Sequence, residues 1–438
     1  MKNAVVDGRR VYAYARAEGG DTMSTAWKRI SCGSPALVAI ALTAVVSAGR
    51  HPDGRMSRER YLFVWAGDQA RRAPDVLTVV NFDERSADYG RVIATEPLPA
   101  PGSAGNEPHH VGLSADGNIL AAGGLLSVLT GQPEIFFFDV SQPTSPRFVS
   151  SIDPPMSAIT DEFHALPDGG FLVTMMGGPM GHAPGRVVEL DRNLQLVKEH
   201  PEAPPDDGFN PHGISVRPDL NRMVTSDFIC PSTTLHAVPG DLDLRGSIRV
   251  WSLRPRRIVK TVEIPGAGGT IDVQLIPGDR QGRAYTAGML DDKLYLVDTR
   301  AGRARAVFDF ASIARGGWPQ LIRMTQDGTR LFITMNVAGR VAMFDTSAPE
   351  HPRLLSTLNL GPDAGPHYLA LTRDERRLVV SDYFLNEDDF GKVHREGDHR
   401  IHVARVTRNA LVLDSRFDLD FDTAFPTGPA RPHGMAMK

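Results

Sequence analysis

Residues 109–124 read HHVGLSADGNILAAGG, and this stretch decides the fold. It places one strand-like segment before an Asp-Gly turn at Asp116 and a second apolar segment after it. Apolar segments on both sides of an Asp-Gly dipeptide are a strong short-range signal for a β-hairpin. We therefore expect an all-β chain wherever the same pattern recurs.

The hairpin pattern recurs along the chain, which is typical of a repeat architecture. The other copies are residues 161–176, 212–227, 272–288, 320–336 and 367–382, with a truncated copy at 433–438. Two more strand-like segments follow each complete copy, for example 247–253 and 258–264 after the copy at 212–227. Four antiparallel strands at a spacing of about 50 residues predict the blades of a β-propeller. Seven copies predict seven blades.

The two ends of the repeat region complete each other. Residues 61–67, 76–83 and 91–98 are strand-like but have no opening hairpin strand, whereas the last copy has only that strand. Pairing the C-terminal strand with these N-terminal strands would close the ring and remove free sheet edges. The sequence thus predicts a single seven-bladed propeller domain over residues 55–438.

The first 48 residues have the pattern of a secretory signal that follows an N-terminal extension. Lys28 and Arg29 precede the apolar run 36–46, and the small residues 47–49 follow it. That run is too short to span a bilayer, so we expect cleavage and a mature start near residue 49, without a membrane anchor. The predicted location is periplasmic or secreted. The true start codon is either Met1 or Met23.

Charge and cysteine content narrow the classes of partner. The chain has 48 Lys+Arg against 52 Asp+Glu, a balance that gives no reason to expect a nucleic-acid partner. Cys32 and Cys230 are the two cysteines, and cleavage would leave Cys230 without a disulfide partner. We expect Cys230 to be a buried structural thiol. The oligomeric state stays open.

A ring of polar residues is predicted at the mouth of the channel, because the first strand of every blade lines it. Counting back seven residues from each turn aspartate gives His109, Asp161, His212, Asp272, Gln320 and His367, and His433 joins them by its match to the sequence around His212. Four imidazoles converging on one axis would repel one another once protonated, which favours a bound metal. Imidazole ligands suit copper, zinc, iron or nickel. We favour copper for an exported protein, with zinc as the alternative that the ligand type leaves open.

Two further histidines, His110 and His164, lie close to the ring positions in sequence. The two-residue period of a regular strand would point their side chains away from the channel. The channel end of a strand is often irregular, so we keep both as candidate metal ligands.

The chain resembles the selenium-binding protein family, whose bacterial members include copper-dependent, periplasmic methanethiol oxidases. The resemblance runs from about Tyr61 to the C-terminus. It is carried by Glu107-Pro-His-His, the hairpin that begins at His164, Gly208-Phe-Asn, Ile248-Arg-Val-Trp, Gly365-Pro and Pro432-His433.

The resemblance implies that His109, His110, His164 and His433 hold copper. The cysteine usually held responsible for selenium binding is absent from residues 61–64, so we do not expect selenium binding.

The activity implied is oxidation of a small thiol, in which thiol, dioxygen and water give an aldehyde, hydrogen sulfide and hydrogen peroxide. Asp161 or Glu162 could shuttle protons in this reaction. The alternative is an exported metal-binding propeller without turnover, because the fold hosts many functions. A lactonase-type propeller would need an oxygen-rich calcium site, which the histidine-dominated ring argues against.

Overall fold

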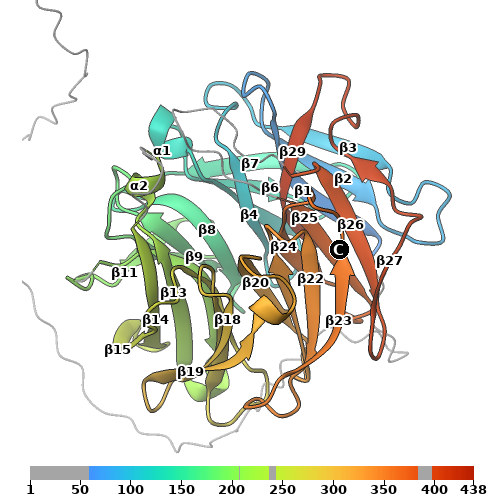
Figure 1. The fold of residues 1–438 in the computed structure, drawn as a ribbon. Helices are drawn as coiled ribbons and strands as arrows, with labels where there is room; N and C mark the ends of the chain where they lie inside the picture. The colour runs from blue at the N-terminus through green and yellow to red at the C-terminus, as the bar shows by residue number, and fades with distance from the viewer. Residues whose placement is uncertain (1–58, 207, 236–242, 383–396) are drawn as a thin grey trace, which may run out of the picture. The chain divides into compact units, whose positions relative to one another are not determined.

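The computed structural model describes residues 59–206, 208–235, 243–382 and 397–438 (Figure 1). The extension and signal peptide predicted over residues 1–48, the mature start near residue 49 and the predicted domain boundary at residue 55 lie outside these ranges and stay predictions. Within the described ranges, the strands form seven antiparallel sheets, which confirms the seven-bladed propeller.

Six of the seven sheets contain one of the predicted hairpins as their first two strands, and in the seventh the first strand comes from the C-terminal end of the chain. The sheet that joins the two ends consists of β29 (Ala430–Met437), β1 (Tyr61–Asp68), β2 (Val76–Asn81) and β3 (Val92–Pro97). The next two are β4 (Pro108–Leu113), β5 (Ile119–Gly124), β6 (Ile135–Asp139) and β7 (Arg147–Ile152), then β8 (Ala158–Ala165), β9 (Phe171–Gly177), β10 (Arg186–Leu190) and β11 (Leu196–His200).

The remaining four sheets repeat this order. Two are β12 (Pro211–Arg217), β13 (Arg222–Ile229), β14 (Leu244–Ser252) and β15 (Arg257–Glu263), then β16 (Thr270–Leu275), β17 (Arg283–Gly288), β18 (Lys293–Asp298) and β19 (Arg303–Asp309). The last two are β20 (Pro319–Met324), β21 (Arg330–Met335), β22 (Arg340–Asp345) and β23 (Arg353–Asn359), then β24 (Pro366–Leu371), β25 (Arg377–Asp382), β26 (Arg400–Val406) and β27 (Leu411–Leu413), with β28 (Leu419–Asp420) also on β26.

The closure predicted from the two ends is confirmed. β29 pairs with β1 in antiparallel register, with Phe63 opposite Ala436 and Gly67 opposite Arg431, so the C-terminal strand becomes the first strand of the N-terminal sheet (Figure 1). Among the described sheets, the first strand of every blade then lies between the first strands of two other blades, so the ring is closed.

The hydrophobic core lies between the blades. An apolar cluster occupies each of the seven junctions between neighbouring sheets, the closing junction included. At one junction the Trp65 indole of β1 packs on Phe136 and Phe138 of β6, with ring centroids 5.9 and 5.6 Å apart. Burial between blades stabilises the ring without disulfides, and the single cysteine in the described part of the chain, Cys230, is buried and free as expected.

Helices are few in the described residues: α1 (Ser127–Thr130), α2 (Pro231–Leu235) and two one-turn 3₁₀ helices at Pro218–Leu220 and Phe310–Ser312. None of them has the length and apolar character needed to cross a membrane.

Candidate metal centre

The first strands of neighbouring blades contact one another and form the inner wall of the ring. Each of the seven first strands contacts the first strand of the next blade, and these strands are β4, β8, β12, β16, β20, β24 and β29. All seven predicted ring residues lie in the first half of these strands and are buried, which brings His109, His212, His367 and His433 to one end of the channel.

A β-bulge interrupts each first strand at its ring residue. The register shifts between Pro108 and Val111 in β4, and between Thr160 and Phe163 in β8. Equivalent shifts fall at the ring residues of the other five blades. A bulge inserts an extra residue and re-aims the side chains around it. Two successive residues can therefore face the channel, as His109 and His110 do.

Hydroxyl side chains of the second strands bond the backbone groups that the bulges expose. The Thr334 hydroxyl accepts from the Leu321 amide of its own blade at 3.1 Å and donates to the His367 carbonyl of the next blade at 3.0 Å. Ser226 repeats this arrangement, accepting from Gly213 at 2.9 Å and donating to Ile271 at 2.7 Å. These bonds link neighbouring blades at the depth of the ring residues, so the positions of the ring side chains are fixed by more than one blade.

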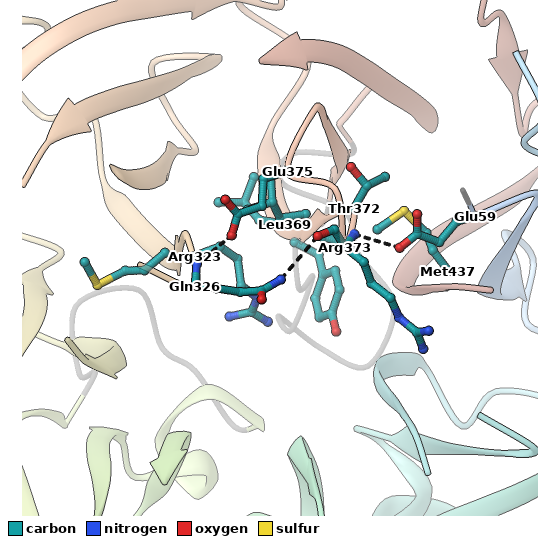
Figure 2. A pocket seen from close by; sticks show the side chains of 12 residues that line it. Glu59, Arg323, Gln326, Leu369, Thr372, Arg373, Glu375 and Met437 are labelled. Atoms are coloured by element: carbon teal, nitrogen blue, oxygen red, sulfur yellow. Dashed lines mark hydrogen bonds between the residues drawn. The ribbon is translucent and has the colours of Figure 1, made fainter. Parts of the chain in front are cut away.

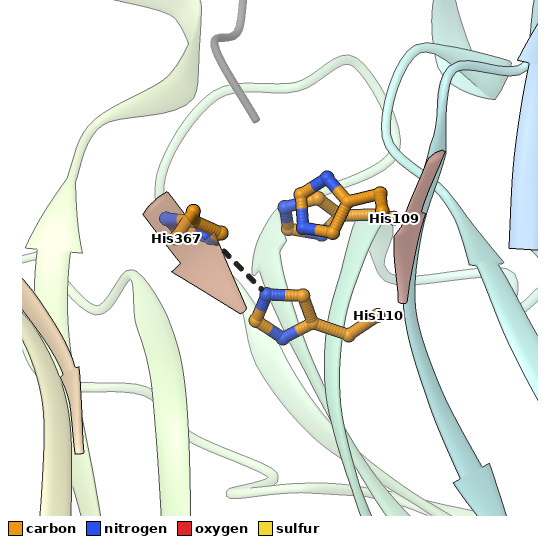
Figure 3. A group of neighbouring side chains, drawn as sticks. His109, His110 and His367 are labelled. Atoms are coloured by element: carbon orange, nitrogen blue, oxygen red, sulfur yellow. Dashed lines mark hydrogen bonds between the residues drawn. The ribbon is translucent and has the colours of Figure 1, made fainter. Parts of the chain in front are cut away.

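Four imidazoles meet in the channel. One nitrogen each from His109, His110, His367 and His433 lies within 4.8 Å of the others. None of these residues is more than 7% exposed. Figure 3 shows His109 and His110 of β4 facing His367 of β24, with His110 Nε2 3.4 Å from His367 Nε2. Ligands about 2.0–2.1 Å from a tetrahedral zinc or copper ion are about 3.4 Å apart, so this spacing fits two ligands of one ion.

Hydrogen bonds at Nδ1 orient three of the four rings. His109 Nδ1 lies 3.0 Å from the Thr160 carbonyl, His110 Nδ1 lies 2.9 Å from Glu162 Oε2, and His367 Nδ1 lies 2.6 Å from Gln320 Oε1. Each partner is an acceptor, so Nδ1 carries the proton and Nε2 is left to face the cluster. Histidines that bind metals usually have their other nitrogen held in this way.

The Asp161 carboxylate lies among three of the histidines. Its oxygens are 3.2 Å from His110 Nδ1, 3.0 Å from His212 Nε2 and 3.7 Å from His109 Nδ1. These distances define two further groups with metal-ligand spacing, one of His109, Asp161 and His212 and one of His110, Asp161 and Glu162. His212 thus belongs to the site through Asp161 and lies outside the group of four imidazoles.

Burial dominates the electrostatics of the imidazoles. It lowers the pKa of His109, His212, His367 and His433 well below the ordinary value, and the positive charge of neighbouring histidines lowers it further. Neutral imidazoles offer a lone pair to a metal. His110 differs, because Asp161 and Glu162 outweigh the effect of its burial and raise its pKa to about 9.

Arg323 sets the charge of Glu162. The guanidinium of Arg323 lies 3.0 Å from Glu162 Oε1 and 3.4 Å from Asp272 Oδ2. Burial alone would raise the pKa of Glu162, but Arg323 and then His110 lower it below the ordinary value. Glu162 is therefore an ionised acceptor between His110 and Arg323.

His164 lies outside the three groups with metal-ligand spacing. It follows the bulge of β8, where the strand has returned to regular pairing with Leu172 opposite, and its side chain is partly exposed. The role of His164 as a ligand stays a prediction, as do the assignments of the other five histidines and of Asp161 and Glu162.

Sequence reasoning missed two residues of the site. Arg323 follows the ring residue Gln320 by three positions, and Tyr368 comes directly after His367. The Tyr368 ring packs 4.8 Å from the His110 ring and its hydroxyl donates to the Val111 carbonyl at 3.2 Å. A charged residue inside a channel strand was the available signal for Arg323.

Comparisons with known proteins identify a family and agree with the fold. Residues 51–438 match the 56 kDa selenium-binding protein family. A protein named methanethiol oxidase from Hyphomicrobium sp is 28% identical over 388 residues, covering 83% of this chain and 84% of the relative. Another of that name from Ruegeria pomeroyi is 26% identical, covering 86% and 89%.

Among solved structures, the hypothetical selenium-binding protein from Sulfolobus tokodaii matches with a TM-score of 0.73 at 18% identity. The match covers 89% of this chain and 96% of that one, and at this identity it supports the fold alone.

Proposed function

This chain belongs to the 56 kDa selenium-binding protein family, and from that premise we propose that it is a copper-dependent oxidase of small thiols. The observation that carries the proposal is the group of four buried imidazoles whose nitrogens lie within 4.8 Å of one another. Relatives named methanethiol oxidase, at 23–28% identity, support oxidoreductase chemistry and a thiol substrate.

The donor set favours copper over the hard cations. Imidazole nitrogens suit copper and zinc, whereas calcium and magnesium take oxygen ligands. His109, His110, His367 and His433 would hold the ion through Nε2, and His212 would stay beside Asp161. Bound copper would supply a soft acceptor for thiolate sulfur and the redox chemistry with dioxygen.

The residues of the chain hold the ligands and the protons. Thr160, Glu162 and Gln320 fix the Nδ1 protons of three ligands and so keep the Nε2 lone pairs directed at the ion. Asp161 and Glu162 are the carboxylates nearest the cluster and are the candidates to take the thiol proton. The reaction balances when one primary thiol, one dioxygen and one water give one aldehyde, one hydrogen sulfide and one hydrogen peroxide.

Metal analysis and oxygen uptake together test the proposal. Purified protein should contain about one copper per chain, and a His109→Ala, His433→Ala double variant should lose it. Oxygen uptake with methanethiol should stop when a chelator removes the metal. Stoichiometric metal without uptake across small thiols would favour the alternative, a metal-binding propeller without turnover.

We also propose that the protein is exported to the periplasm or secreted, because residues 28–49 have the pattern of a signal peptide. N-terminal sequencing of protein from the producing cells should give a start near residue 49. A start at Met1 or Met23 in the mature protein would contradict export.

A further inference from the structure

A pocket opens at the end of the channel opposite to the ring residues. It has a volume of about 370 Å³ and is lined by the last residues and turns of β20 and β24, by Met437 near the end of β29, and by Glu59. Figure 2 shows its wall residues in close view, with the labelled Arg323 and Arg373 on two neighbouring blades. Since first strands run from the ring residues toward their turns, the pocket and the imidazole cluster lie at different depths of one channel.

Hydrogen bonds between blades hold the walls of the pocket. Glu59 Oε1 accepts from the Arg373 amide at 2.7 Å, and Glu375 Oε1 accepts from the Gln326 amide at 2.6 Å. The Gln326 side chain donates to the Arg373 carbonyl at 3.2 Å (Figure 2). The pocket is therefore largely preformed, as binding sites for small molecules usually are.

The floor of the pocket touches the cluster. Tyr368 and Arg323 both line the pocket. On its other side, the Tyr368 ring lies 4.8 Å from the His110 ring. Arg323 lies 3.0 Å from Glu162, which accepts from His110 Nδ1 at 2.9 Å. One layer of side chains thus separates the pocket from a candidate ligand.

Apolar side chains pack beside His212 in the described part of the chain. Ile159 and Met176 belong to a buried cluster drawn from three blades. Phe228 packs against this cluster and also lies edge-on to His212, with ring centroids 5.3 Å apart. The pocket, whose lining includes Arg323, Gln326 and Glu375, offers a path toward the cluster for a polar ligand.

We propose that this pocket is the entrance for the substrate, a small thiol with a short alkyl group, and that Tyr368 and Arg323 are its inner gate. The inference rests on the proposed function. Met324, Ala370 and Met437 provide an apolar wall for the alkyl group.

The test narrows the pocket without touching the cluster. Ala370→Phe and Gln326→Trp place a ring in the pocket, and Leu290→Trp is the matched control. Leu290 is 52% exposed and lines a second pocket of about 380 Å³. Copper content and the thermal midpoint identify variants that fold and load normally.

Two rates then report on access: kcat/KM for methanethiol, and the rate at which cyanide removes copper from the loaded protein. We expect both to fall by about tenfold or more in Ala370→Phe and Gln326→Trp, because a narrowed route slows association, and to stay unchanged in Leu290→Trp. Unchanged rates in both pocket variants, or a loss confined to Leu290→Trp, would overturn the inference alone. If the wild-type protein contains no metal, the proposed function is overturned as well. If it contains copper but does not oxidise thiols, the rate at which cyanide removes copper still tests the route.

Discussion

Replacement of Ile159 tests whether the backbone beside the cluster is strained. Ile159 has φ of 67°, is 1% exposed, and immediately precedes Thr160, whose carbonyl accepts from His109. The left-handed region costs a non-glycine residue about 1–2 kcal/mol. The carboxyl group of Glu134 accepts from the Ile159 amide at 2.8 Å and helps to hold this conformation.

The magnitude follows from comparing Ile159→Gly with Ile159→Ala. Both remove the buried side chain, which costs about 2–4 kcal/mol. Glycine is normally about 0.5–1 kcal/mol less stable than alanine inside a strand. Relief of the left-handed cost should reverse that order, so that glycine is more stable than alanine at this position by about 0.5–1 kcal/mol.

Urea unfolding of the two variants measures the difference. Ala158→Gly is the matched control, because Ala158 is the neighbouring buried residue of the same strand and is not among the residues with positive φ. Glycine should be the less stable residue at position 158. The difference between the glycine-minus-alanine stabilities at positions 159 and 158 gives the backbone strain, about 1–2 kcal/mol. A difference near zero would refute the reasoning, and copper content should be unchanged in Ile159→Gly.

Further predictions concern the ligands, the carboxylate behind them and a buried acid. His110→Ala should lower the copper content, as measured by metal analysis, because His110 belongs both to the group of four imidazoles and to the ligand set that the resemblance implies. Copper retained in His164→Ala would support the group of four, copper lost there would support His164 as a ligand, and unchanged copper in His110→Ala would contradict both sets. Glu162→Gln should weaken copper binding about 10–100-fold in a competition with a coloured chelator, because the charge that holds His110 is lost. Burial raises the pKa of Asp75 from its ordinary 3.8 to about 7, so the folded state retains a proton that the unfolded chain has lost, and stability falls as pH rises through that window. Asp75→Asn should flatten the dependence of the urea midpoint on pH over this window, and an unchanged slope would show that Asp75 is not responsible.

The sequence was sufficient to predict the blades, the closing strand and the ring residues, because each depends on local patterns. The direction of His110 depends on the bulge in β4. The period of a regular strand would point this side chain away from the channel, and His110 stayed a candidate because the channel ends of strands are often irregular. The pairing of Arg323 with Glu162 joins residues 161 positions apart and needed the assembled ring. Counting did place His212 at the cluster, but only the structure shows that its Nε2 faces Asp161.

The strand that closes the ring is also the strand that carries His433. During synthesis, the three histidines from β4 and β24 can be present long before β29 leaves the ribosome, yet the fourth arrives only when β29 docks beside β1. Binding of copper by all four histidines would therefore require that synthesis has reached β29 and that β29 has paired with β1. A chain truncated before β29 would lose His433 as a candidate ligand. It would also lose the strand that pairs with β1 and closes the ring.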